Sequence, residues 1–188
     1  MPSPIAHLGA GYVLFAFFRR HLSPAVIETT GRGLILLAIC FFFSMLPDID
    51  AVPGFLSGDM GRYHNQWTHS LLWALGLSAL LAAIVYAVKR KAFLAWFTLL
   101  FSCYSIHIVM DYFTYGRGVR LLWPVAADRF KSDPSFFGGL HWSEGLFSSN
   151  HIWTAIEEIS FGAILIAAYH IFEFICRRLS EARRNSRE

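Results

Sequence analysis

The stretch AFLAWFTLLFSCYSIHIVMD, residues 92–111, decides the fold class of this chain. It carries no acidic or basic side chain before His107. A helix that crosses the roughly 30 Å hydrocarbon core of a bilayer needs about 20 apolar residues. Residues 92–110 therefore predict a membrane-spanning helix. The helix closes on His107 and Asp111, two side chains that are costly beside a membrane and usually functional there.

Apolar blocks of similar composition recur along the chain, which is 55% hydrophobic and only 15% charged. A soluble domain carries about 25% charged residues, and a disordered chain needs low hydrophobicity, so both classes are excluded. No repeat or linker divides the sequence. We expect one all-α membrane domain over residues 1–188, a helical bundle of about five spans with a long outer loop between the fourth and fifth. Besides 92–110, the expected spans are 4–18, 33–47, 69–88 and 152–176.

The basic residues orient this bundle. The net charge is +3, but the Lys and Arg residues form short clusters between apolar blocks rather than one face, so we expect no nucleic-acid partner. Cytoplasmic loops carry an excess of Lys and Arg. An outer N-terminus places eleven of them on the cytoplasmic side, including those of a basic tail at 177–188. The outer side keeps five, which are Arg62, Arg117, Arg120, Arg129 and Lys131.

With this orientation, seven candidate metal ligands lie at or near the outer ends of the first four spans. His107 and Asp111 are four residues apart and share one helix face. Asp48 and Asp50 follow Pro47, which is expected to end the second span. Imidazole and carboxylate together suit a divalent metal, with zinc favoured and manganese or iron as alternatives. The full set is His7, Asp48, Asp50, His64, His69, His107 and Asp111.

Other polar residues are open to several interpretations. Thr68 is expected to cap the third span while His69 points to the site. Glu157 and Glu158 are candidates to reach the site, to bind cations of a substrate, or to pair with Arg117 or Arg120. The outer loop adds His141, Glu144 and His151.

Four segments resemble one known family. They are HLGAGY from His7, LPDID at 46–50, HNQWTHS at 64–70 and HIVMDYFTYGRGVRLLWP at 107–124. Together they resemble the YdjM-type membrane-bound metal-dependent hydrolases, which include a LexA-regulated bacterial inner-membrane protein. The resemblance covers residues 1 to about 124. It implies a protein of the bacterial inner membrane. The Lys and Arg count adds a multi-pass topology with the N-terminus and metal site outside and the C-terminus cytoplasmic.

That family is distantly similar to the zinc-dependent phospholipase C and P1 nuclease group, so the resemblance implies two zinc ions. His7 and Asp111 would hold the first. The second would be held by Asp48 or Asp50, His64 or His69, His107, and a bridging Asp111. A third metal is not expected, because neither His141 nor His151 is followed by an acidic residue four positions later.

The resulting hypothesis is an enzyme that hydrolyses a phosphate ester of a membrane lipid or lipid-linked substrate by a two-metal mechanism. Whichever of Asp48 and Asp50 is not a ligand would orient water or act as general base. An unligated His64 or His69 would protonate the leaving group. The substrate phosphate would be held by Arg62, Arg117 or Arg120.

The alternative is a non-enzymatic membrane protein, either a metal-ion carrier or a scaffold with a structural His/Asp cluster. A carrier should show ionisable residues at mid-span and on both sides. Here they gather at one end, which favours the hydrolase. Amide hydrolysis at the same metal site is a further alternative.

Overall fold

The computed structural model describes residues 4–21, 33–90, 92–139 and 149–186, and within them every regular element is helical. The expected all-α class is confirmed. Five long helices form the body, namely α1 (Pro4–His21), α3 (Leu34–Met45), α6 (Leu71–Lys89), α7 (Phe93–Tyr112) and α8 (Asn150–Asn185). Four short elements connect α3 to α6, namely η1 (Leu46–Ala51), α4 (Val52–Ser57), α5 (Met60–Tyr63) and η2 (Trp67–His69).

Four segments of the described chain are long and apolar enough to cross a membrane. The fifth long helix, α1, is not among them, because Arg19, Arg20 and His21 make up its last turn. The four are Leu34–Ser57, Leu71–Lys89, Phe93–Tyr112 and His151–Asn185.

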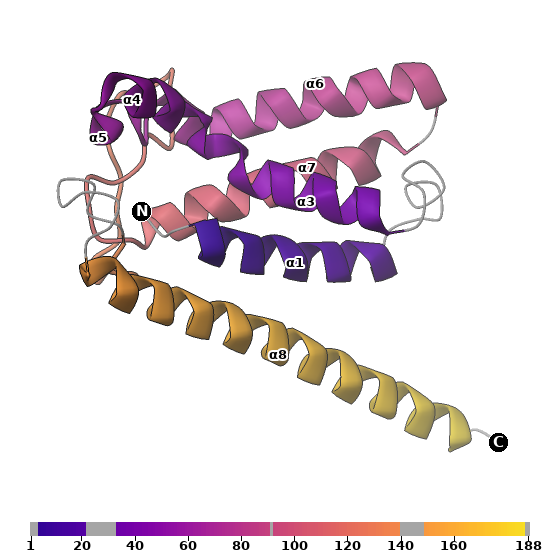
Figure 1. Ribbon diagram of the computed structural model, residues 1–188. Coiled ribbons are helices and arrows are strands. Elements are labelled where there is room, and N and C mark those ends of the chain that lie inside the picture. Colours follow the sequence, from indigo (N-terminus) through magenta and orange to yellow (C-terminus); the bar gives the residue numbers. More distant parts are fainter. Residues whose placement is uncertain (1–3, 22–32, 91, 140–148, 187–188) are drawn as a thin grey trace.

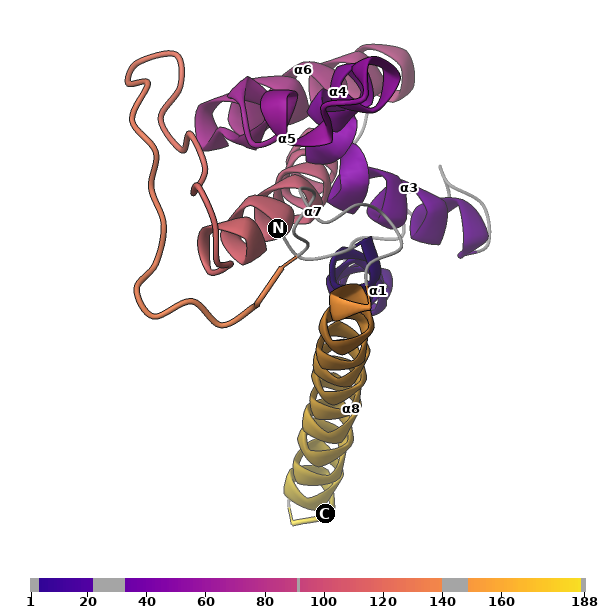
Figure 2. The same cartoon turned by 60° about the vertical axis from the view of Figure 1, so that its left-hand side comes forward.

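Helix α7 is the centre of the bundle, and it packs against α6, α3 and α1 (Figure 1). Its buried residues Leu99, Cys103 and Ile108 meet Leu36 and Cys40 of α3 in one apolar core. Helix α8 lies along α1 and projects away from the rest of the bundle (Figure 2). Its C-terminal half therefore leaves most of its surface exposed.

The helix boundaries near the candidate ligands differ from those expected. Helix α3 ends at Met45, just before Pro47, and the chain continues through η1 into α4. Helix α6 begins at Leu71, and its N-cap is Ser70, whose Oγ accepts hydrogen bonds from the next turn of backbone. The prediction that Thr68 caps this helix is wrong, because its hydroxyl donates to Asp50 instead.

The last helix is longer than the predicted span 152–176, and it continues through the described part of the basic tail to Asn185. Arg178 and Glu181 lie one turn apart there, with Nη1 and Oε2 separated by 3.8 Å. Such pairs support exposed helix by a few tenths of a kcal/mol. At 36 residues, α8 is about 54 Å long and exceeds the roughly 30 Å core of a bilayer.

The two ends of the bundle differ in chemistry. One end gathers the start of α1, the elements η1 to η2, the end of α7 and the start of α8 (Figure 1). The basic clusters at Arg19–Arg20, Lys89–Arg90 and Arg177–Arg178 lie towards the other end. The candidate ligands and the basic clusters are thus separated along the helix axes, as the charge pattern predicts.

We predict that Gly11→Ala destabilises the bundle. A Cβ at Gly11 would lie 2.8 Å from Ser44 Oγ and 3.3 Å from the Phe41 ring, so α1 and α3 must move apart. Overpacking of this kind costs about 1–3 kcal/mol. The thermal unfolding midpoint in detergent should fall. Gly76→Ala on α6 is the matched control, because a Cβ there meets nothing within 4 Å, and an equal loss in both variants would contradict the prediction.

Candidate metal centre

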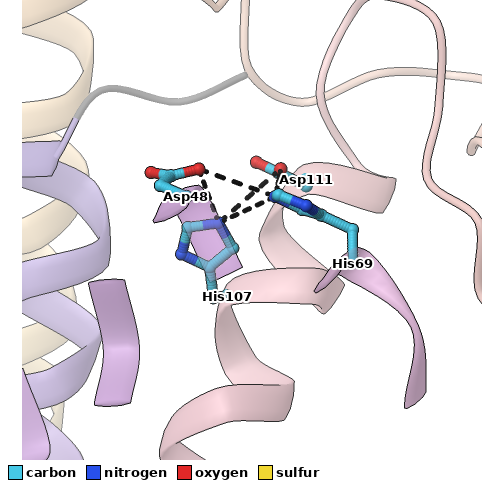
Figure 3. A group of neighbouring side chains, drawn as sticks. All are labelled: Asp48, His69, His107 and Asp111. Carbon is cyan, nitrogen blue, oxygen red and sulfur yellow. Dashed lines mark hydrogen bonds and ion pairs between the residues drawn. The ribbon is translucent and has the colours of Figure 1, made fainter. Parts of the chain in front are cut away.

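Four of the predicted ligands form one compact group (Figure 3). Asp48 comes from η1 and His69 from η2, while His107 and Asp111 come from one face of α7. One ligand atom from each lies within 4.8 Å of the others. The three segments are distant in sequence, and all four residues are buried or nearly so. Of the alternatives left open by the sequence, Asp48 and His69 belong to this group, which we call the tetrad.

The distances within the tetrad are short and even. Asp48 Oδ1 lies 3.2 Å from His107 Nε2 and 3.5 Å from His69 Nε2. Asp111 Oδ2 lies 3.1 Å from His69 Nε2 and 3.7 Å from His107 Nε2. The two Nε2 atoms are 3.3 Å apart. Zinc bonds of about 2.0–2.2 Å in a tetrahedron put neighbouring ligand atoms about 3.3–3.6 Å apart, so the spacing of the tetrad fits a metal ion of this size.

Both tetrad histidines present the same nitrogen to the centre. His107 Nδ1 donates to the Ser44 carbonyl at 2.7 Å, and His69 Nδ1 donates to Asp50 Oδ2 at 3.2 Å. Each ring is therefore fixed with Nε2 turned inwards. Ligating histidines in proteins almost always donate their other N–H to a carbonyl or carboxylate in this way.

The tetrad oxygens face histidine nitrogens. Asp48 Oδ1 and both oxygens of Asp111 are buried, and the polar atoms nearest to them in the described chain are the nitrogens of His7, His64, His69 and His107. Buried carboxylate charge is costly unless a positive charge pairs with it. A cation at the centre would satisfy these oxygens, so the donor set fits a divalent metal.

Asp50 plays a different part from Asp48. Its Oδ2 accepts from the Gln66 N–H and the Thr68 hydroxyl, both at 2.8 Å, and also from His69 Nδ1. Its Oδ1 accepts from His64 Nδ1 at 3.1 Å. Asp50, His64 and His69 also lie close enough to hold an ion. However, four donors already occupy the Asp50 carboxylate, so we interpret it as the group that orients His69.

Two further predicted ligands flank the tetrad. The His7 ring stacks on His107 with centroids 3.7 Å apart, and its Nε2 lies 3.6 Å from Asp111 Oδ1. His7 is fully buried, and neither ring nitrogen has a hydrogen-bond partner among the described residues. His64 Nε2 is likewise buried and unpartnered there. All seven predicted ligands are thus gathered at one end of the bundle.

The carboxylates set the charge of His69. Burial by itself lowers the pKa of its imidazole, but the nearby Asp111, Asp48 and Asp50 more than compensate and raise it well above its ordinary value. Without metal, the site therefore holds a proton on His69 at neutral pH. The same negative surroundings favour a divalent cation.

Two arginines hold the loop that carries His64, and a third, Arg120, neighbours one of them. Arg117 Nη2 donates to the His64 carbonyl at 3.1 Å, and Arg129 Nη1 donates to the Asn65 and Gly118 carbonyls at 3.0 Å. Burial and the neighbouring Arg117 and Arg120 lower the pKa of the Arg129 guanidinium, which indicates that the three positive charges lie close together. Arg62 is exposed on α5, against the ring of Tyr63.

The remaining predicted residues stand apart from the tetrad. Glu158 is buried and Glu157 is exposed on α8, and neither belongs to a potential metal-binding group. His151 lies in the first turn of α8. His141 and Glu144 lie outside the described residues.

Several residues that organise the site escaped the sequence analysis. The Ser44 carbonyl fixes His107, and Tyr104 donates to the Thr68 carbonyl at 2.9 Å between the two tetrad segments. The sequence analysis used Arg129 only in the count of Lys and Arg residues that sets the orientation of the chain in the membrane. Tyr104 lies three residues before His107 on α7, and this helical spacing is the one signal that the sequence offered.

Comparison with known families gives a match over most of the chain. The family model described as YdjM inner membrane protein matches residues 1–179. The match runs through most of α8, well past residue 124, where the motif resemblance ended. Searches of curated proteins and of solved structures find no significant match.

We predict that metal affinity rises with pH. Metal binding must displace the proton on His69, whose pKa is raised, so binding releases a proton at all pH values below that pKa. One released proton makes the apparent affinity about tenfold weaker for each unit of pH decrease. A chelator competition assay with zinc at pH 6, 7 and 8 measures this slope. Affinity independent of pH would contradict a protonated His69.

We also predict unequal effects for the aspartates. Asp111→Asn removes a group of the tetrad and should abolish tight metal retention, whereas Asp50→Asn should weaken zinc affinity about 10- to 100-fold by loosening His69. Asp59→Asn is the control, because Asp59 is exposed and its side chain caps no helix. Zinc content after dialysis, measured by elemental analysis, should follow that order. If Asp50→Asn retained as little zinc as Asp111→Asn, Asp50 would be a metal ligand rather than the group that orients His69.

Proposed function

This chain belongs to the YdjM inner membrane protein family, and we propose that it is a membrane-embedded metal-dependent hydrolase. The reaction we infer is cleavage of a phosphate ester in a lipid or lipid-linked substrate. The observation that carries this proposal is the tetrad of Asp48, His69, His107 and Asp111, with inward Nε2 atoms and metal-sized spacing.

The tetrad would hold one zinc ion, with manganese or iron as alternatives. Asp111 and His7 offer a place for a second, because Asp111 Oδ1 lies near His7 while Oδ2 faces the tetrad histidines. When bound, two such ions neutralise the charge of a phosphate ester and ionise water at neutral pH. The unpartnered nitrogens of buried His7 support this assignment.

Other residues of the chain would position the metal ligands and transfer a proton. Asp50 and the Ser44 carbonyl keep His69 and His107 in the orientation that turns Nε2 inwards. His64 gives its Nδ1 hydrogen to Asp50, which leaves Nε2 as the free nitrogen of the site. In its imidazolium form His64 would also carry a proton on Nε2, and we assign it the transfer of that proton to the leaving alcohol, which leaves the neutral imidazole still bonded to Asp50 through Nδ1.

The surroundings favour a substrate with both phosphate and apolar parts. Arg117, Arg120 and Arg129 provide positive charge on the loop beside the site, and Arg120 Nε has no hydrogen-bond partner in the described chain. On η1 and α4, apolar side chains are exposed next to Asp48 and Asp50. These are Ile49, Val52, Phe55 and Leu56, between 51% and 79% exposed. A phospholipid matches this combination of positive charge and exposed apolar surface, because it has an anionic phosphate and apolar acyl chains.

The position of the tetrad in the bundle suggests where a substrate would enter and which side of the membrane the site would face. Asp48 is the tetrad residue with measurable exposure, 13% of its side chain, so substrate would approach from its side. The basic clusters lie towards the opposite end, and the positive-inside rule then assigns the tetrad end to the outer face of the inner membrane.

The test is hydrolysis by purified full-length protein in detergent. Soluble bis(p-nitrophenyl) phosphate and phosphatidylglycerol micelles are offered after chelation and again after zinc is restored. We expect activity that requires zinc and that falls at least about 1000-fold in Asp111→Asn, while Asp59→Asn retains the unmodified rate. Full activity in Asp111→Asn would end the proposal.

Two outcomes would favour the rival classes. Zinc flux into proteoliposomes without hydrolysis of either phosphate substrate would make the protein a carrier. Cleavage of an amide substrate but neither phosphodiester would leave the metal centre in place and replace the substrate class.

A further inference from the structure

A second polar site lies at the end of the bundle away from the tetrad. There the C-terminal half of α1 and the second half of α8 enclose a cavity of about 310 Å³. This volume is at the lower end of the range of small-ligand sites, about 300–1,000 Å³. Its charged lining consists of Arg19, Arg20, Glu173 and Arg177, and Tyr12, Tyr169 and His170 add further polar groups.

The charges around this cavity do not balance. Glu173 is the only carboxylate that lines it in the described chain, and it is 92% buried. Its two oxygens are used by Arg20, which forms an ion pair, and by His21, whose Nε2 lies 3.3 Å away. Arg19 and Arg177 have no carboxylate partner among the described residues, so the described lining carries three guanidinium groups against one carboxylate.

The neighbouring groups suit a phosphate. Guanidinium groups bind phosphate oxygens with paired, charge-assisted hydrogen bonds. The Tyr12 hydroxyl and His170 Nε2 lie 3.4 Å apart and add two hydrogen-bonding groups to the same wall. Basic cavities between membrane helices are known to receive anionic lipid headgroups.

On the face turned away from α1, the same turns of α8 carry exposed apolar side chains. Ile171, Phe172 and Ile175 are 50–63% exposed on a candidate membrane span of which 11% is buried. We propose that the cavity is a second ligand site, which binds the phosphate group of an anionic lipid headgroup or a free phosphate. The site is separate from the tetrad and does not depend on the hydrolase proposal.

The experiment uses purified full-length protein in a neutral detergent. Short-chain phosphatidylglycerol, short-chain phosphatidylcholine and inorganic phosphate are titrated separately, and binding is measured by native mass spectrometry. We expect saturable binding of phosphatidylglycerol or of inorganic phosphate, with phosphatidylcholine weaker than phosphatidylglycerol. Phosphatidylglycerol binding that phosphate does not compete identifies a lipid site, and effective competition identifies a phosphate site.

The variant Arg19→Gln/Arg177→Gln should lose at least about tenfold in affinity, since each charged hydrogen bond contributes about that factor. The control Arg183→Gln/Arg184→Gln removes the same charge farther along α8 and should bind as the unmodified protein does. Zinc content and melting midpoint report whether either variant perturbs the fold. Absence of saturable binding, or equal losses in the two double variants, would overturn the proposal.

Discussion

Burying two imidazoles against two carboxylates is the constraint on which this end of the molecule depends. The Nδ1 atoms of His69 and His107 each donate a hydrogen bond, to Asp50 and to the Ser44 carbonyl. Their Nε2 atoms therefore face one another at 3.3 Å. Two nitrogen lone pairs repel each other at that distance, and the nearby carboxylates add negative charge. A proton or a cation at the centre of the tetrad would remove this repulsion. The short elements η1 and η2, the Ser70 cap and the Tyr104 hydrogen bond all contribute to holding the four groups in place.

The bundle supports this arrangement through α7. That helix carries the apolar core on its N-terminal turns and the polar pair His107 and Asp111 on its last two turns. Helix α1 extends the arrangement, since it stacks His7 on His107 at one end and forms the arginine-lined cavity with α8 at the other. One helix thus takes part in both polar sites, although the ligands we propose for the two sites carry opposite charge.

The sequence predicts the membrane class, the starting residues of the long helices to within two residues, and the gathering of His and Asp at one end. Those features follow from block hydropathy and from the positions of Lys and Arg. The choice between Asp48 and Asp50 could not be predicted, because they are two residues apart and the conformation of η1 decides which one faces the tetrad. The role of Ser44 could not be predicted for another reason. Every residue has a backbone carbonyl, so the residue type does not indicate which carbonyl accepts the His107 hydrogen bond. The length of α8 was underestimated because charged residues end a hydropathy block without ending a helix.

Helix α3 has a consequence for the bilayer itself. Its 12 residues extend about 18 Å before η1 begins, whereas α6 and α7 run for 19 and 20 residues beside it. The candidate span Leu34–Ser57 is completed only by η1 and α4, so a membrane that matches the longer pair meets a hydrophobic mismatch where α3 ends. A bilayer relieves such a mismatch by thinning. The resulting dimple would form beside Asp48, where it would bring headgroups down to the depth of the ligands. A lipid would then need no extraction from its leaflet to reach them.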